Sequence, residues 1–283
     1  MPAPTVFTAQ RQGAALKPAL DGYGNVAAAY SLRKVVPNYF GSAIKVRRSS
    51  DNAELDIPFC YSNASREFVL CTGTLQSFVG AGSGFVTTWY DQSGNGRNAT
   101  QATAANQPEV ITSGINSRPS INYGIITSQK NLAYSAGGTT SNWRDSFVVA
   151  SWDSSNSTFP VNNGLICASA TATGGTADGV GVMGVISTDS WNSASWAWPN
   201  ICINGGPASM VAFPAITSPF VLRASADADI GVNGVCIGND RNVVNRSWRG
   251  RISEVTLFSA SLSAASRQKL ERNQGRFFGI SVS

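Results

Sequence analysis

The sequence predicts an all-β fold, a sandwich or jelly roll, with short helices near its two ends. From residue 107 onward, short stretches rich in β-branched and aromatic residues alternate with turn residues at near-regular spacing. The 28 glycines and 12 prolines are spread along the chain, as expected for many turns. Because 283 residues suffice for one large β domain, we expect an extended arm over 1–19 and a single domain over 20–283.

The first hundred residues predict two helical segments and two strands. Asn25 is a suitable N-cap for a short alanine-rich helix that Pro37 would end. Alternation of apolar and basic residues over 42–48 predicts a strand, and Gly80 closes a second helical turn over 74–80. The expected elements are a helix over 25–34, a strand over 42–48, a helical turn over 74–80 and a strand over 85–90.

A tight turn follows the strand over 85–90. The side chains of Asp91 and Ser93 can accept hydrogen bonds from backbone amides just ahead, and Gly94 adopts a positive φ at little cost. We therefore favour a structural turn. The alternative is a cation site with Asp91, Asn95 and Asn98 as oxygen ligands, but one carboxylate is weak for calcium, and we expect no metal.

The rest of the chain predicts a succession of strands and a closing helix. Between 151 and 188 the loops are rich in Gly, Ser, Thr and Ala and should decorate one rim of the sandwich. Ser263 is an N-cap for the last helix, and Gly275 stands at its expected C′ position. The expected elements are strands over 120–123, 146–152, 164–168, 179–186, 194–198, 201–203, 220–225, 234–238 and 249–258, and a helix over 263–274.

Composition excludes several classes of function. The chain has no histidine, which removes Ser-His-Asp catalysis and imidazole metal sites. A net charge of +5 without a long basic run argues against nucleic-acid binding and fits a mild attraction to acidic surfaces. No signal-peptide pattern and no apolar run near 18 residues is present, so we expect no membrane insertion.

The five cysteines form no CxxC pair, so zinc is not expected, and no other cofactor is indicated. Cys60 and Cys71 flank a short loop and could pair in an oxidising compartment. The other cysteines are scattered, as buried small hydrophobic residues usually are.

Four segments carry a family resemblance: Ala29–Arg33, Val46–Asn52, Asp56–Ile57 and Gly84–Gln101. In these segments the chain resembles the catalytic domain of fungal α-L-arabinofuranosidase B, and it resembles more closely the concanavalin A-like, laminin-G-type domains of bacteriophage structural proteins. The resemblance spans roughly 20–101 and returns from Val235 to the C-terminus. It implies a concanavalin A-like jelly-roll sandwich with short N-terminal and C-terminal helices.

The remaining enzymatic possibility is a glycosidase, which needs two carboxyl groups. By resemblance to arabinofuranosidase B, Asp240 stands at the acid/base position. The segment expected to hold the nucleophile reads Ile201–Pro207, and no Asp or Glu lies between Asp189 and Asp227. An inverting reaction would need a base from Asp178, Asp189 or Asp227. We therefore expect no catalytic residue and no enzymatic activity.

Tryptophans are the stronger binding candidates. Trp191, Trp196 and Trp198 lie within eight residues, and flat aromatic faces stack on sugars. Trp196 and Trp198 would share one face of a strand, and the alternative is that they fill the core. Asp240 beside Arg241 is either an acceptor for a glycan or a turn aspartate.

These observations predict a non-catalytic phage virion structural protein, a capsid decoration, head-fibre or tail-fibre module that presents a carbohydrate-binding jelly roll for host attachment. Its expected partners are other virion proteins through the N-terminal arm and a cell-surface glycan, with a homo-oligomer left open, and its expected location is the virion. The alternatives are an α-L-arabinofuranosidase-like glycoside hydrolase and a purely structural capsid cement protein.

Overall fold

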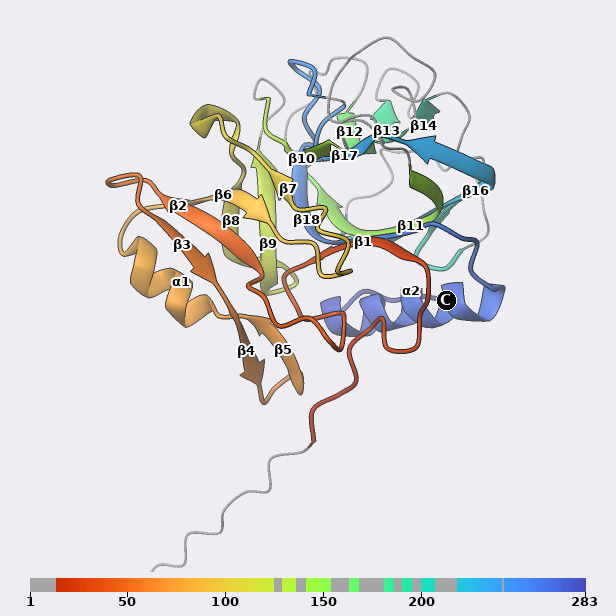
Figure 1. Cartoon of the computed structure of the whole chain (residues 1–283), viewed down its shortest axis with the longest axis horizontal. Helices are drawn as coiled ribbons and strands as arrows, with labels where there is room; N and C mark the ends of the chain where they lie inside the picture. Colours follow the sequence, from red (N-terminus) through yellow and green to blue (C-terminus); the bar gives the residue numbers. More distant parts are fainter. Residues whose placement is uncertain are drawn as a thin grey trace, which may run out of the picture.

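The computed structural model describes residues 14–124, 129–135, 141–153, 163–167, 181–185, 190–194, 200–206, 218–240 and 242–283. Over these residues the fold is an antiparallel β sandwich, and the all-β prediction is confirmed. Figure 1 shows a long curled sheet whose β10, β12, β13 and β17 form one layer above β1, β11 and β18. The N-terminal strands are β1 (Val26–Ser31), β2 (Ile44–Arg48), β3 (Glu54–Ile57), β4 (Phe59–Ser62), β5 (Glu67–Leu70), β6 (Gly84–Trp89), β7 (Ala99–Thr100), β8 (Glu109–Ile115) and β9 (Arg118–Gly124).

The second half of the chain supplies the remaining strands. They are β10 (Leu132–Ser135), β11 (Ser141–Trp152), β12 (Asn163–Cys167), β13 (Gly181–Val185), β14 (Ser190–Ala194), β15 (Asn200–Ile203), β16 (Phe220–Val232), β17 (Gly234–Ile237) and β18 (Gly250–Phe258). The helices are α1 (Thr72–Val79), the short 3-10 helix η1 (Ala104–Asn106) and α2 (Ala264–Phe278).

Strand order shows that the two halves of the chain are interleaved. The main sheet runs β14-β13-β12-β17-β10-β7-β6-β8-β9-β18-β11-β16-β15, while β1 pairs with β18 and β2 pairs with β3 and β6. The strands β4 and β5 form a separate hairpin. Because β18 pairs with β1 and β9 as well as with β11, a strand from the C-terminal region lies beside strands from the first half.

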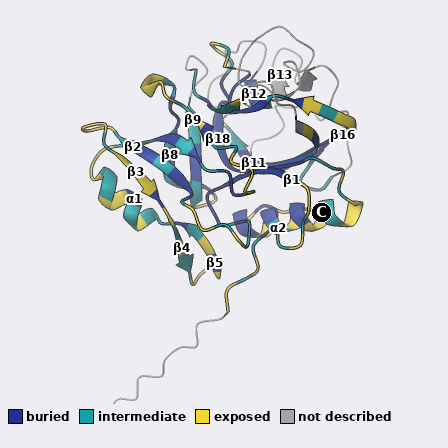
Figure 2. Ribbon diagram, in the orientation of Figure 1, coloured by how far each residue is buried: buried dark blue, intermediate teal, exposed yellow. Residues whose placement is uncertain are grey.

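The main hydrophobic core lies between the two layers of the sandwich. It contains Trp89, Tyr123, Val148, Leu222 and Leu257, all fully buried, and Figure 2 shows the inner strands as almost continuously buried. This apolar burial is the dominant stabilising contribution to such a fold.

Helix α2 covers the outer face of β1, β11 and β18. Leu270 of the helix packs with Ala29, Phe147 and Phe258 in a second apolar cluster. The strand β18 is therefore buried on both faces, with a nearly uninterrupted buried pattern. Such a strand shows no alternation of apolar and polar residues.

The helix predicted over 25–34 is wrong, because this segment contains strand β1. Asn25 has a φ of 58°, which is not an N-cap conformation. The alanine side chains are small enough for β1 to pack between the core and α2, with Ala28 facing the core and Ala29 the helix. Pairing with β18 outweighs a helix propensity of a few tenths of a kcal/mol per residue.

Most other predicted elements are found. The strands over 42–48 and 85–90 correspond to β2 and β6, and the helical turn over 74–80 is α1, which ends at Gly80 with a φ of 59°. Ser263 caps α2 by accepting a bond from the Ser266 amide. The predicted cap Gly275 is wrong, since α2 continues to Phe278 and Gly279 provides the left-handed end.

A disulfide joins Cys60 of β4 to Cys71, the residue before α1, with their Cα atoms 4.9 Å apart. It links one strand of the β4–β5 hairpin to the segment that leaves the other strand. Of the predicted arm, residues 14–19 are described, and the Leu16 amide donates to the Arg66 carbonyl at 2.7 Å. Neither helix of the described chain is long and apolar enough to cross a bilayer.

Candidate active site

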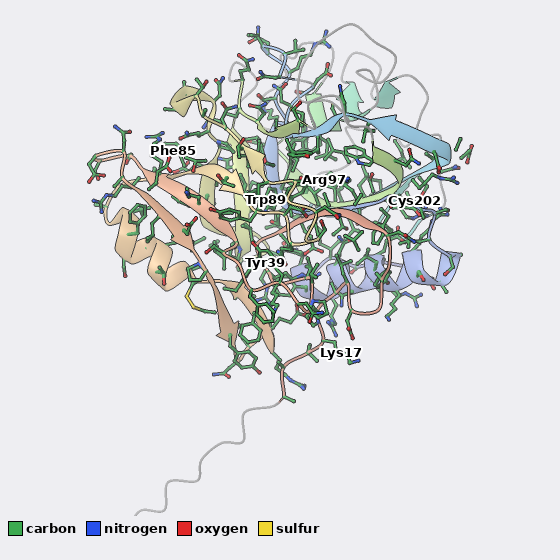
Figure 3. All side chains as sticks on the ribbon, in the orientation of Figure 1. Lys17, Tyr39, Phe85, Trp89, Arg97 and Cys202 are labelled. Atoms are coloured by element: carbon green, nitrogen blue, oxygen red, sulfur yellow. A yellow bond between two sulfur atoms is a disulfide. The ribbon has the colours of Figure 1, made fainter. Side chains whose placement is uncertain are left out.

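The turn after β6 is a structural clasp that we define as Asp91–Asn98. Both carboxylate oxygens of Asp91 accept hydrogen bonds from protein donors: the Ala29 amide at 2.9 Å, the Ser93 amide and hydroxyl, and the Arg97 amide at 3.1 Å. The Arg97 guanidinium donates to the Ala27 carbonyl at 3.0 Å, and Figure 3 shows this side chain beside β1. The predicted structural turn is therefore confirmed in its hydrogen bonds.

The clasp continues through Gln92 into a buried ion-pair network. The Gln92 side chain bonds the Val35 amide and the Ser31 and Arg33 carbonyls. The fully buried Arg33 guanidinium donates to both oxygens of Glu254, at 2.8 and 3.1 Å, and to Glu67 at 2.9 Å. Two of the segments that carry the family resemblance, Ala29–Arg33 and Gly84–Gln101, are thus joined by buried hydrogen bonds.

The Asp240 site begins where β17 ends. Gly238 has a φ of 78°, and a Cβ at this position would lie 2.0 Å from a ring carbon of Tyr123. Its amide donates to the Leu165 carbonyl at 2.9 Å, and its carbonyl accepts from the Trp248 amide at 2.8 Å. Only glycine fits this conformation and this contact, so the chain turns sharply between β17 and Asp240.

A second glycine brings β12 against the same turn. A Cβ on Gly164 would lie 2.1 Å from the backbone nitrogen of Asp240. The amides of Gly164 and Asp240 both donate to the Arg246 carbonyl, at 3.0 and 3.2 Å, and the Asp240 carbonyl accepts from the Val243 amide at 2.9 Å. The backbone of Asp240 is therefore fixed from both sides.

The Asp240 carboxylate is completely buried and faces two side chains of different chemistry. One oxygen forms an ion pair with the Arg246 guanidinium, whose side chain is 34% exposed. The other oxygen accepts a hydrogen bond from the Cys167 thiol on β12, at 3.8 Å. The carboxylate is thus held by the guanidinium of a residue that follows it in the sequence and by the thiol of a residue that precedes it.

Burial shifts the pKa values of two side chains near this turn. Burial raises the pKa of the Tyr123 hydroxyl well above its usual value, with a smaller contribution from Cys236. Burial also lowers the pKa of Lys130, whose carbonyl accepts a bond from the Ser247 hydroxyl at 3.1 Å. The surroundings of Asp240 are therefore of low polarity, where charge interactions are strong.

The other predicted binding residues are not brought to this site by any described contact. Trp196, Trp198 and Arg241 lie outside the described residues. Trp191 lies on β14, where its backbone pairs with Gly184 of β13, and its side chain is not described. Strands β14, β13, β12 and β17 are neighbours in this order, so Trp191 and Asp240 belong to the same part of the sheet.

The carboxylates considered as a base have separate positions. Asp178 and Asp189 lie outside the described residues. Asp227 is exposed on β16, where its side chain accepts from Asn200 at 3.0 Å and its carbonyl accepts from Arg144. No group of three or more acidic or cysteine side chains suited to a metal occurs in the described part of the chain.

Sequence reasoning did not identify Arg246 and Cys167 as partners of Asp240. Arg246 follows Asp240 by six residues in a turn-rich segment, and this short separation could have indicated that the two side chains lie close together. Cys167 precedes it by 73 residues and contacts it only because β12 and β17 are adjacent. Two open pockets in the described part of the chain, of about 780 and 430 Å³, lie beside the clasp and beside Trp152, and Asp240 lines neither of them.

The fold is similar to that of arabinofuranosidases of known structure. It is similar to the structure of an arabinofuranosidase complexed with arabinofuranosyl-α-1,2-xylobiose, with 17% identity and a TM-score of 0.58. It is also similar to a point mutant of a GH54 α-L-arabinofuranosidase soaked with 4-nitrophenyl α-L-arabinofuranoside, with 16% identity and a TM-score of 0.56. Each alignment covers 88% of this chain and 62% of the other chain, so the sequence spans less than two thirds of the length of these proteins.

The chain belongs to the family of catalytic domains of α-L-arabinofuranosidase B, whose family model matches residues 20–166, more than half of the sequence. None of the curated proteins compared with the chain matches it. The matched region ends at Ile166 and so contains the clasp and most of β12 but not Asp240.

These findings correct the functional expectation. Of the two resemblances, the bacteriophage one was wrong, and the non-catalytic virion protein it implied, whether decoration, fibre or cement, is overturned by the family match. The expectation that the chain is not an enzyme was wrong for the same reason. That expectation depended on the segment Ile201–Pro207, which contains no acidic residue. The composition of this segment leaves open which residue supplies a second carboxyl group.

Proposed function

We propose that this protein is an α-L-arabinofuranosidase-type glycoside hydrolase that removes arabinofuranosyl groups from larger saccharides. The observation that carries the proposal is the match of the arabinofuranosidase B catalytic family to residues 20–166. The sandwich fold, similar to that of the arabinofuranosidases over 88% of the chain, supports it.

Asp240 is the residue proposed to protonate the leaving oxygen. Its carboxyl group is fully buried just beyond the end of β17, and a positioned carboxyl group is a common general acid. Its backbone is fixed by Gly164, Gly238 and the Arg246 carbonyl, which positions the carboxyl group. Because the carboxylate is fully buried behind contacts with Arg246 and Cys167, substrate binding must displace the partly exposed Arg246 side chain.

The second carboxyl group distinguishes two reaction courses. A retaining enzyme holds its two carboxyl groups about 5–5.5 Å apart, and an inverting enzyme about 6.5–9.5 Å apart, with water between them. Since no acidic residue lies between Asp189 and Asp227, the candidates are Asp178, Asp189 and Asp227.

The test is hydrolysis of 4-nitrophenyl α-L-arabinofuranoside by the wild type and by Asp240→Asn, with Asp229→Asn as a matched control. Asp229 is exposed and pairs with Arg144, so its substitution leaves the rate unchanged. We expect Asp240→Asn to lower kcat/KM for a poorly activated saccharide by about 10²- to 10⁴-fold. An inactive wild type on both aryl and natural arabinofuranosides contradicts the proposal.

The same assay identifies the second group. Whichever of Asp178→Asn, Asp189→Asn and Asp227→Asn abolishes turnover marks it, and proton NMR of the first-formed sugar reports retention or inversion of the anomeric centre.

A further inference from the structure

A group of aromatic side chains surrounds one lysine beside the β4–β5 hairpin. We call it the Lys34 aromatic patch and define it as Lys34, Phe40, Tyr61 and Phe68. Phe40 is 88% exposed and Phe68 42% exposed. The β4–β5 hairpin carries two of these residues, and Figure 2 shows most of it in the colours of intermediate and exposed residues. Exposed rings that gather at one place usually mark an interaction surface.

The patch is built on fixed backbone. Tyr61 and Phe68 face each other across β4 and β5, with ring centroids 5.5 Å apart in an edge-to-face arrangement. The Lys34 amide donates to the Phe68 carbonyl at 2.8 Å, which ties the segment after β1 to the hairpin. The disulfide Cys60–Cys71 closes the base of the same hairpin. The hydrogen bond and the disulfide hold the backbone that carries these two rings in place, which lowers the entropic cost of binding.

Lys34 lies between the rings. Its ammonium nitrogen is 4.7 Å from the centre of the Phe40 ring and 5.9 Å from that of Phe68, within the range of cation–π contacts. No carboxylate in the described part of the chain forms an ion pair with it. Within the described part of the chain, no carboxylate therefore competes with a ligand for this ammonium group.

The other charges of the hairpin do not cancel this one. Glu67 is buried and is already paired with Arg33 at 2.9 Å and with Arg276 at 3.3 Å. Arg66, at the start of β5, donates to the Ala14 carbonyl. Lys34 and Arg66 therefore place positive charge beside the rings, while Glu67, the acidic residue of the hairpin, is already paired.

We propose that the Lys34 aromatic patch binds a carboxylate-bearing polysaccharide, with Lys34 paired to a uronate group and the faces of Phe40 and Phe68 stacked on sugar rings. The choice of a saccharide rests on the proposed function, and the choice of an acidic one rests on Lys34. The patch shares no residue with the Asp240 site, so it holds a polymer while the active site acts on a side group.

The test is native gel electrophoresis of the full chain through gels containing polygalacturonate, with neutral dextran as the uncharged comparison. We expect polygalacturonate to retard the wild type and Asp240→Asn equally, since binding at the patch needs no turnover. This separates the inference from the proposed function, because failure of hydrolysis leaves retardation unchanged. Added salt weakens the interaction, since exposed charges are screened.

Substitutions within the patch locate the binding. Lys34→Ala should weaken the apparent affinity by about two- to fivefold, the range of an exposed ion pair. Phe40→Ala should weaken it by about two- to tenfold, and Phe40→Tyr should keep it. The matched control is Lys269→Ala, which removes another lysine that lies over an aromatic ring, 5.7 Å from the centre of Tyr23, and should leave retardation unchanged.

Three results overturn the inference. One is a wild type that polygalacturonate does not retard more than dextran does. Another is equal retardation of Lys34→Ala, Phe40→Ala and the wild type, which assigns the effect to overall charge. The last is a concentration-dependent dimer, seen by analytical ultracentrifugation, that Phe40→Ala dissociates, because the patch then binds a second copy of the chain.

Discussion

Asp91 connects the two segments that identify the family. Its two oxygens receive four hydrogen bonds, and one of their donors is the amide of Ala29, which is fully buried on β1. A buried amide without an acceptor costs about 1–3 kcal/mol, so a single carboxylate here stabilises both its own turn and the neighbouring strand. The same saturation leaves no oxygen of Asp91 free to coordinate a cation within this arrangement.

We expect Asp91→Ala to lower the free energy of unfolding by about 2–4 kcal/mol, since four donors lose their acceptor at once. Asp21→Ala is the control, because Asp21 is partly exposed and, among the described residues, pairs only with the highly exposed Lys17, a contact worth about 0.5 kcal/mol at most. Urea denaturation of both variants measures the difference. A calcium-dependent midpoint in the wild type, lost in Asp91→Ala, would instead show that the turn holds a cation.

Some residues of the site were readable from sequence and others were not. The turn chemistry of Asp91, Ser93 and Gly94 follows from local hydrogen bonding, so the clasp could be predicted. The contact between Cys167 and Asp240 depends on the pairing of β12 with β17, which no local pattern specifies. Asp240 itself was found only through a motif, and its complete burial was not visible in the motif.

At the scale of elements, the same distinction separates α2 from β1. The N-cap Ser263 and the apolar positions of α2 are local signals, and the helix begins where they predict. β1 contains alanines that favour a helix, but its conformation is decided by its pairing with β18, far away in the sequence. The end of α2 was misplaced because Gly275 serves a packing role instead of a capping role.

Gly275 allows the C-terminal tail to pack against α2. A Cβ there would lie 2.5 Å from a methyl carbon of Val282 and 2.6 Å from the Ile280 carbonyl oxygen. We therefore expect Gly275→Ala to destabilise the fold by about 1–3 kcal/mol, even though alanine is the better helix former.

Gly73→Ala in α1 is the matched control for this substitution. No atom lies within 4 Å of a Cβ at that position, so alanine should stabilise the helix by up to about 1 kcal/mol. Thermal unfolding followed by circular dichroism measures both variants. Equal shifts of Tm in the same direction would show that the tail does not pack on Gly275.

At the scale of the whole molecule, the residues that fold together extend beyond the residues that the family model matches. The match ends at Ile166, within β12. Strands β1, β9 and β11 of the matched region all pair with β18, and β10 and β12 pair with β17. The main core likewise contains residues from both regions, such as Trp89 and Leu257. Interleaving of this kind arises from non-local pairing, which is why the sequence predicted a sandwich but not its strand order.

The fragment 20–166 should therefore not fold alone, although it holds most of the family signature. Without β17 and β18 it leaves the edges of β1, β9, β10, β11 and β12 unpaired and exposes one side of the core, and such edges promote aggregation. We expect the isolated fragment to lack near-UV circular dichroism and a cooperative urea transition, whereas the chain 14–283 shows both. Co-expression with 167–283 should restore a soluble complex of the two pieces. Cooperative unfolding of 20–166 by itself would mean that strand pairing within the matched region suffices, and that Asp240 is carried by an appended element of the fold instead of its central layer.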